Sequence, residues 1–162
     1  MPENNFAVSA YIENESSILL VKHKKQQAWV PIGGKIEPNE TPAIAVVREV
    51  REETGLIVGT DCEFIPTRSF ELGLTDLTGM LAYHEYSSKP GGMHMCFSYI
   101  LHSRHRNIVA CDEYTETTWL NWPYFSAIAS KKESVTFNGV PIPPNVVKLL
   151  YRCFSCLHGS GW

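Results

Sequence analysis

The sequence predicts an α/β domain in which a mixed β-sheet packs against at least two helices. Short runs rich in Val, Ile and Tyr alternate with polar turns, a pattern typical of strands. The segment 41–55 carries start and stop signals for a helix, and a second apolar helical pattern follows Pro143. The chain has 162 residues and no repeat, low-complexity tract or linker, so we expect one domain spanning 1–162.

The composition argues against membrane proteins and against proteins that bind nucleic acid through a large basic surface. The net charge is −3, so no overall basic field would draw the chain to nucleic acid or to an acidic membrane. The longest aliphatic run, Ile18–Val21, is far too short to span a bilayer, and residues 1–10 lack the features of a signal peptide. The five scattered cysteines indicate reduced thiols and a cytoplasmic location. We expect no membrane association and no stable binding of nucleic acid, with the chain a monomer or a homodimer.

The N-terminal part reads as strands and turns. Phe6–Ile12 and Ser17–His23 are strand-like segments separated by turn residues, and we expect them to form a hairpin. A polar loop over 24–28 leads to a short extended piece, Trp29–Ile32. The adjacent Gly33-Gly34 pair predicts a break in the chain.

The clearest helix lies between Thr41 and Gly55. Thr41 is suited to the N-cap, Pro42 to the first helical position, and Gly55 to the C-terminal stop. The residues expected on its buried face are Ala43, Val46, Val47 and Val50.

The rest of the chain is expected to be rich in strands and to end in a helix. Between 56 and 101 we expect strands at Met80–Tyr86 and Met95–Leu101, and Thr117–Asn121 is a further short candidate. Pro143 and Pro144 precede an apolar helix that is expected to run to about Cys156.

Three carboxylates share one face of the first predicted helix. Glu49, Glu52 and Glu53 stand at i, i+3 and i+4, which brings their side chains together. Like charges at this spacing repel by about 0.2–0.5 kcal/mol per pair, so the trio is unfavourable unless a cation lies among them. Hard divalent ions such as Mg²⁺ and Mn²⁺ prefer oxygen ligands of this kind.

Two neighbouring features complete a possible metal and phosphate site. Arg48 stands four residues before Glu52 and can hold its carboxylate in position. The Gly33-Gly34 loop permits a close backbone approach, which would let its carbonyls reach an ion above the helix. A solvated acidic helix after an ordinary Gly-Gly turn would explain the Glu-x-x-Glu-Glu pattern alone, so the decision depends on the wider motif.

The wider motif is complete. The stretch from Gly34 to Leu56 reads GKIEPNETPAIAVVREVREETGL. It fits Gly-x5-Glu-x7-Arg-Glu-U-x-Glu-Glu-x-Gly-U, with U a bulky aliphatic residue, at every position, and thus resembles the Nudix box. The resemblance implies an α/β/α sandwich around a central mixed sheet. It also implies metal-dependent hydrolysis of a pyrophosphate bond in a nucleoside diphosphate linked to another moiety, with a small nucleotide as substrate and Mg²⁺ or Mn²⁺ as cofactor.

The same resemblance implies roles for individual residues. Glu52 and Glu53 are expected to bind the metal, and Glu49 is either a ligand or the base that deprotonates the attacking water. Some subfamilies carry the base outside the box. The Gly33 carbonyl is expected to be a further ligand. Arg48 and Glu40 are expected to orient these groups, and Arg48 is included among the catalytic residues for that reason. Gly34 and Lys35 are expected to contact the substrate.

Two further candidates lie outside the box. Glu113 stands six residues before Trp119, the offset at which MutT-like members carry a metal ligand; Glu116 is its rival, and a plain loop carboxylate is the alternative for both. Asn145 resembles a position where some MutT-like enzymes read a base, since an amide both donates and accepts. An N-cap role is the simpler interpretation of Asn145.

The sequence leaves other functions open. Nudix-fold modules that bind nucleotides without cutting them typically lose one or more box glutamates, whereas all are present here. A fold that mainly serves a protein partner is a second alternative. Among hydrolase substrates the candidates are nucleoside triphosphates, oxidised or not, nucleotide sugars and RNA 5′ ends.

Overall fold

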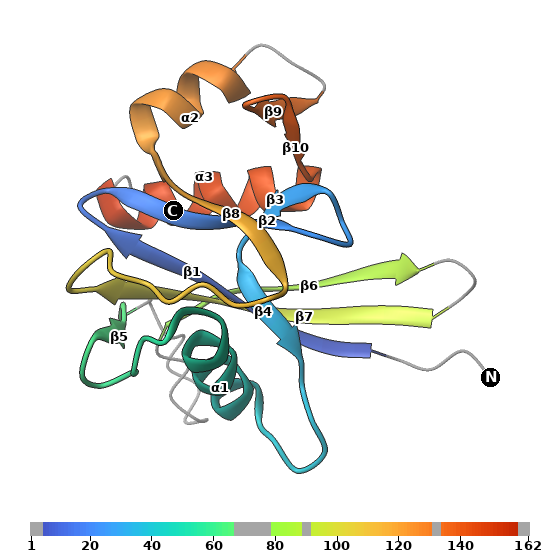
Figure 1. Ribbon diagram of the computed structural model, residues 1–162. Helices are drawn as coiled ribbons and strands as arrows, with labels where there is room; N and C mark the ends of the chain where they lie inside the picture. The colour runs from blue at the N-terminus through green and yellow to red at the C-terminus, as the bar shows by residue number, and fades with distance from the viewer. Residues whose placement is uncertain (1–4, 67–78, 89–91, 131–133, 159–162) are drawn as a thin grey trace.

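A twisted mixed sheet lies between α1 on one face and α3 on the other (Figure 1). The structure is a computed structural model and describes residues 5–66, 79–88, 92–130 and 134–158. Its strands are β1 (Asn5–Asn14), β2 (Ser17–His23), β3 (Ala28–Val30), β4 (Ile32–Lys35), β5 (Cys62–Phe64), β6 (Met80–Ser88), β7 (Gly92–Ser103), β8 (Tyr114–Asn121), β9 (Val135–Phe137) and β10 (Val140–Ile142). Its helices are α1 (Pro42–Thr54), α2 (Trp122–Ala129) and α3 (Pro144–His158).

The central strand β1 organises the sheet. It runs parallel to β7 from the Asn5–His94 pair to the Glu13–His102 pair, while β4 and β2 pair with its other edge in antiparallel register. The strand order is β3-β2-β1-β7-β5, with β6 also beside β7 and β8 beside β2. This is the expected mixed sheet of an α/β/α sandwich. None of the helices in the described ranges is both long and apolar enough to cross a bilayer.

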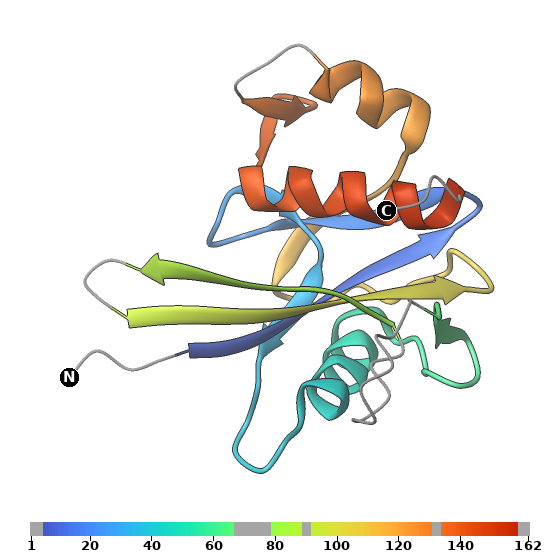
Figure 2. The same cartoon turned by 180° about the vertical axis from the view of Figure 1, so that it is seen from behind.

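Two hydrophobic cores lie on opposite faces of the sheet. Successive side chains of a strand point to opposite faces, so Val8 and Ile12 of β1 pack with α1, whereas Tyr11 packs on the other side. The second core includes Leu150 and Phe154 of α3, which crosses in front of the sheet in Figure 2. The continuous burial of β1 from Val8 to Asn14 thus reflects the presence of a core on each face of the sheet.

The N-terminal hairpin is confirmed, whereas the expectation for the Gly33-Gly34 pair needs correction. β1 and β2 meet at a tight turn in which Glu15 and Ser16 have φ of 49° and 58°. The expected break at Gly33-Gly34 is wrong, because both glycines belong to β4 and pair with β1. A Cβ at Gly33 would lie 2.2 Å from the Val8 carbonyl oxygen, so glycine allows β4 to approach β1 closely instead of ending the strand.

Replacing Gly33 with Ala is therefore expected to destabilise the fold by at least about 2 kcal/mol, because the clash involves backbone atoms that side-chain rotation cannot relieve. Urea denaturation of both proteins measures the difference. Gly139→Ala is the control, since Gly139 has φ of 76° but nothing within 4 Å of its added Cβ. An equal loss in both variants would contradict the close-approach explanation.

Helix α1 begins and ends where expected, but its buried face is different. The Thr41 hydroxyl accepts a hydrogen bond from the Ile44 N–H at 3.3 Å, and Gly55 is left-handed with φ of 74°. The predicted stripe is wrong at Ala43 and Val47, which are exposed. The residues actually buried are Ala45, Val46, Glu49, Val50, Glu53 and Thr54. The helix is rotated so that acidic side chains face β4, which apolar periodicity alone could not indicate.

The C-terminal part contains elements that were not predicted from the sequence, namely α2 and the β9–β10 ribbon. The predicted terminal helix is present, but it starts at Pro144, so Asn145 lies inside its first turn and the N-cap interpretation is wrong. The strands β6, β7 and β8 extend beyond their predicted bounds. The segment 56–101 was expected to be rich in strands, and its residues 67–78 and 89–91 lie outside the described residues.

Candidate functional site

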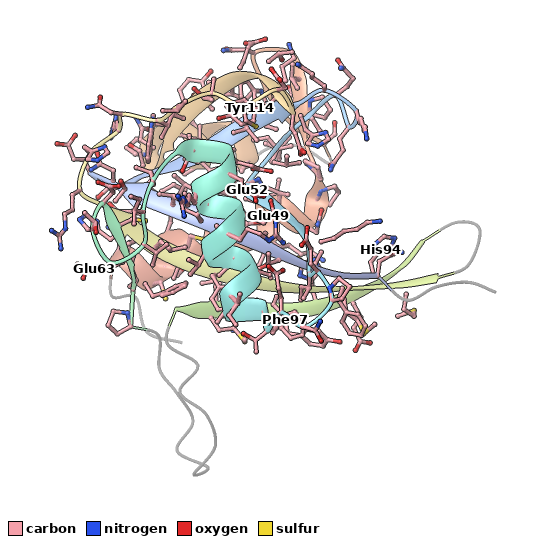
Figure 3. The ribbon with its side chains drawn as sticks, turned by 60° about the horizontal axis from the view of Figure 1, so that its bottom comes forward. Glu49, Glu52, Glu63, His94, Phe97 and Tyr114 are labelled. Carbon is pink, nitrogen blue, oxygen red and sulfur yellow. The ribbon has the colours of Figure 1, made fainter. Side chains whose placement is uncertain are left out.

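The buried face of α1 places two of the three box carboxylates against β4. Glu49 and Glu53 are buried, whereas the side chain of Glu52 is 59% exposed. A Cβ at Gly34 would lie 2.2 Å from a Glu49 carboxylate oxygen, so glycine leaves the space that this carboxylate fills. The Gly33 N–H donates to Glu53 Oε2 at 3.3 Å. Figure 3 shows Glu49 and Glu52 projecting from the same side of α1.

Arg48 forms hydrogen bonds with three acidic side chains of the box. Its guanidinium donates to both oxygens of Glu40 at 2.7 and 2.9 Å, to Glu49 at 2.8 Å and to Glu52 at 3.1 Å. It also donates to the Lys35 carbonyl at 3.0 Å. The hydrogen bonds from Arg48 lower the pKa of Glu40 to about 2, and those carboxylates raise the pKa of Arg48. The expected pairing with Glu52 is present, but Glu40 is the main partner.

Negative charge accumulates where α1 meets β4. Burial, followed by the nearby Glu49 carboxylate, raises the pKa of Glu53 to about 8. Burial also raises the pKa of Glu49, although the hydrogen bond from Arg48 opposes that rise. Glu113 contributes repulsion to both groups, so this carboxylate lies close to the box. Buried carboxylates that repel one another fit a divalent cation.

The side chains are not yet arranged around an ion. Within the described ranges, no three His, Cys, Asp or Glu side chains are gathered closely enough to coordinate one metal. Arg48 keeps Glu52 turned toward itself, so a shared site requires this exposed side chain to rotate. The donor set suits Mg²⁺ or Mn²⁺ in chemistry, since every candidate donor is an oxygen.

A pocket of about 190 Å³ opens beside these carboxylates. Of the residues predicted for the site, those that line it are Gly33, Gly34, Glu53, Glu113 and Asn145. Asn145 reaches the pocket from the first turn of α3, which is far from the box in sequence. Lys35 is not among the lining residues; its side chain is exposed.

The two downstream carboxylates are separated by the strand. Glu113 precedes β8 and lines the same pocket as Glu53. Glu116 lies within β8, and its carboxylate pairs with Lys22 of the neighbouring strand at 2.6 Å. Geometry therefore favours Glu113 over Glu116 as the carboxylate that can join the box.

Several pocket residues were not identified from the sequence. They include Ser9, His23, Gln26, His84, Cys96 and Tyr114. Ser9 could have been suspected, because it interrupts the apolar run of β1 and its hydroxyl lies 2.8 Å from that of Ser98. No local signal marks Tyr114, which meets α1 across 61 residues of chain.

Comparison with known proteins supports the identification of the Nudix box. The family model described as the NUDIX domain matches residues 3–135. A CTP pyrophosphohydrolase from Escherichia coli K12 is 34% identical over 95 residues, covering 50% of this chain and 70% of that protein. An ADP-ribose pyrophosphatase from Methanocaldococcus jannaschii is 46% identical over 54 residues, which is 32% of each chain.

Solved structures share the fold. The crystal structure of a NUDIX-family hydrolase from Clostridium perfringens has a TM-score of 0.67 at 22% identity and covers 96% of this chain and 97% of that one. An Ap4A hydrolase binary complex from C. elegans has a TM-score of 0.65 at 15% identity, covering 98% and 99%. At these identities the likeness is one of architecture. Taken with the family match and the box, it shows that this chain belongs to the Nudix family of pyrophosphohydrolases.

Proposed function

We propose that this chain hydrolyses the pyrophosphate bond of a nucleoside diphosphate linked to another moiety, using Mg²⁺ or Mn²⁺ held by Glu52, Glu53 and Glu113, with the Gly33 carbonyl as a further donor. Glu49 serves either as the base or as an additional ligand. The observation that carries the proposal is the buried, mutually repelling pair Glu49 and Glu53 on the box helix, together with Glu113 from another element. A divalent cation is the group that would turn this repulsion into attraction.

The box residues are proposed to have different roles in hydrolysis. When bound, the ion supplies positive charge at the diphosphate and makes a water molecule more acidic. Glu49 is the candidate base, because burial raises the pKa of its carboxyl and a less acidic group takes a proton more readily. Arg48 orients Glu49 and Glu52 through hydrogen bonds and leaves Glu53 to face the pocket. If Glu49 instead binds the metal, the base comes from outside the box.

The pocket beyond the carboxylates is the proposed place for the nucleoside. Asn145 offers a donor and an acceptor to a base edge. Gly34 lines the pocket, and its backbone is proposed to contact the substrate. Lys35, which is exposed and outside the pocket lining, is the cation proposed for the phosphates. The named relatives act on CTP and ADP-ribose, and the structural neighbour on Ap4A. We propose the same general class: a nucleoside triphosphate, oxidised or not, a nucleotide sugar or an RNA 5′ end.

A substrate panel tests the proposal directly. Each compound is incubated with Mg²⁺ or Mn²⁺, and release of phosphate, pyrophosphate or nucleoside monophosphate is measured. Turnover of at least one compound is expected. Binding without turnover across the panel would favour the alternative, a nucleotide-binding module or a scaffold for a protein partner.

We further propose that the protein is a cytoplasmic monomer or homodimer that binds no membrane and no nucleic acid stably.

Glu113→Gln is expected to raise the Mn²⁺ concentration needed for half-maximal rate by about tenfold or more, because it removes one charged oxygen ligand. Metal titrations of the initial rate measure this change. Glu116→Gln is the matched control: it removes the same charge three residues away, from a carboxylate that faces Lys22. Equal effects of the two variants, or an effect of Glu116→Gln alone, would overturn the assignment of Glu113.

A further inference from the structure

The C-terminal end of α1 is capped by the segment that carries Glu113. The last four carbonyls of a helix have no partner within it. In α1 the Arg51 carbonyl accepts from the Gly55 N–H at 2.9 Å and the Thr54 carbonyl from the Val109 N–H at 2.8 Å. The Glu53 carbonyl accepts from the Tyr114 hydroxyl at 2.6 Å. Two of the four end carbonyls are thus satisfied by the segment 109–114.

Tyr114 is the centre of this cap. Its side chain is 5% exposed and packs in the core between α1 and the sheet. Figure 3 shows it beyond the end of α1 that carries Gly55. Its hydroxyl also lies 3.4 Å from the Val109 carbonyl, a second acceptor. The hydroxyl therefore ties the last turn of the helix to the loop and to the first residue of β8.

Hydrogen bonds hold the backbone of Glu113 and the side chain of its neighbour Tyr114. On one side its own carbonyl accepts from the Lys24 N–H at 3.0 Å, which anchors it to the turn after β2. On the other side the hydroxyl of the adjacent Tyr114 donates to the backbone carbonyl of Glu53, whose side chain is the buried carboxylate of the box. Glu53 and Glu113 are far apart in sequence, and the hydrogen bond from the Tyr114 hydroxyl joins the Glu53 backbone to the residue next to Glu113.

We propose that Tyr114 is a positioning residue: by capping α1 at Glu53 it holds Glu113 at a set distance from the box, so that carboxylates from two separate elements bind one ion. The inference rests on the proposed function, in which Glu53 and Glu113 share a metal. Tyr114 acts through these two residues and does not touch the reacting atoms. Its loss weakens metal binding and leaves the rate at saturating metal largely intact.

Tyr114→Phe removes only the hydroxyl and keeps the packing. We expect Mn²⁺ binding, measured by electron paramagnetic resonance of the free ion, to weaken about fivefold, the factor that one net hydrogen bond represents. The rate at saturating Mn²⁺ should stay within about twofold of the wild-type rate. Tyr83→Phe is the control, because its hydroxyl donates to Glu85 at 2.6 Å on the exposed strand β6. Melting temperatures are measured beside each titration.

A double-mutant cycle separates positioning from a general loss of stability. In the Glu113→Gln background, Tyr114→Phe should weaken Mn²⁺ binding by less than about twofold, because the ligand that it positions is gone. The same fivefold loss in both backgrounds, or no loss in the wild type, would overturn the role of Tyr114. If Glu113→Gln itself leaves Mn²⁺ binding unchanged, the proposed metal site fails, and that failure is distinct from one confined to Tyr114.

Discussion

Glu53→Gln is expected to lower the hydrolysis rate by at least about a hundredfold while leaving the protein folded. Gln keeps the size of the side chain and removes the charge, and a catalytic metal contributes several kcal/mol to the barrier. The comparison is made with the best substrate from the panel, at saturating Mg²⁺ or Mn²⁺. Glu63→Gln, on the exposed position of β5, is the charge-matched control and should retain full activity.

The same variant should be as stable as the wild type, or more stable, when metal is absent. The pKa of Glu53 is raised from 4.5 to about 8 in the folded state. Below pH 4.5 the carboxyl is protonated in both states, and between pH 4.5 and 8 ionisation increasingly favours the unfolded chain. The stability that Glu53→Gln gains over the wild type should therefore grow as pH rises through this window. Thermal melts at about pH 5 and about pH 8 in EDTA measure it.

Two outcomes would contradict the role given to Glu53. One is a variant that keeps a near-normal rate, because the box would then not depend on its buried carboxylate. The other is a variant that unfolds at about pH 8, which would make Glu53 a structural residue. In the wild type, a metal that binds only the folded state should raise the melting temperature, and above its Kd the stabilisation should grow with the logarithm of the metal concentration.

Removing divalent cations is expected to abolish turnover altogether. The buried carboxylates repel one another without a cation, and the described pocket-lining residues include no Lys or Arg that could replace it. Protein treated with EDTA should be inactive on every substrate of the panel, and excess Mg²⁺ or Mn²⁺ should restore the rate. EDTA already saturated with Mg²⁺ is the control and should leave the rate unchanged. Full turnover in metal-free buffer would rule out the proposed mechanism.

Local signals in the sequence were sufficient for α1 and for the strand pattern. Thr41, Pro42 and Gly55 set the ends of the helix through contacts with residues a few positions away. The composition of β1 and β2 is also a local signal, because β-branched and aromatic residues suit an extended backbone. The missed helix α2 also had a local signal, since Asn121 caps it through the Tyr124 N–H at 2.9 Å, but its short apolar run suits a strand equally well.

The position of the acidic face could not be deduced from the helix alone. Apolar periodicity predicted a stripe through Ala43 and Val47, whereas Glu49 and Glu53 are buried in their place. Their burial depends on β4 approaching β1 and α1 closely, which Gly33 and Gly34 permit. A buried carboxylate is energetically unfavourable on its own, so a pattern based on hydrophobicity places it on the outside of the helix.

The sequence by itself determined the family, the metal-binding chemistry expected of the box and the limits of its helix, because these depend on residues within 23 consecutive positions. Tertiary structure decided which carboxylates face the pocket, with Glu113 lining it and Glu116 paired with Lys22, and it placed Asn145 of α3 at the same pocket. It also revealed Tyr114, whose hydroxyl meets α1 across 61 residues. The physical reason is that hydrogen bonds and charges act through space, while sequence patterns record only spacing along the chain.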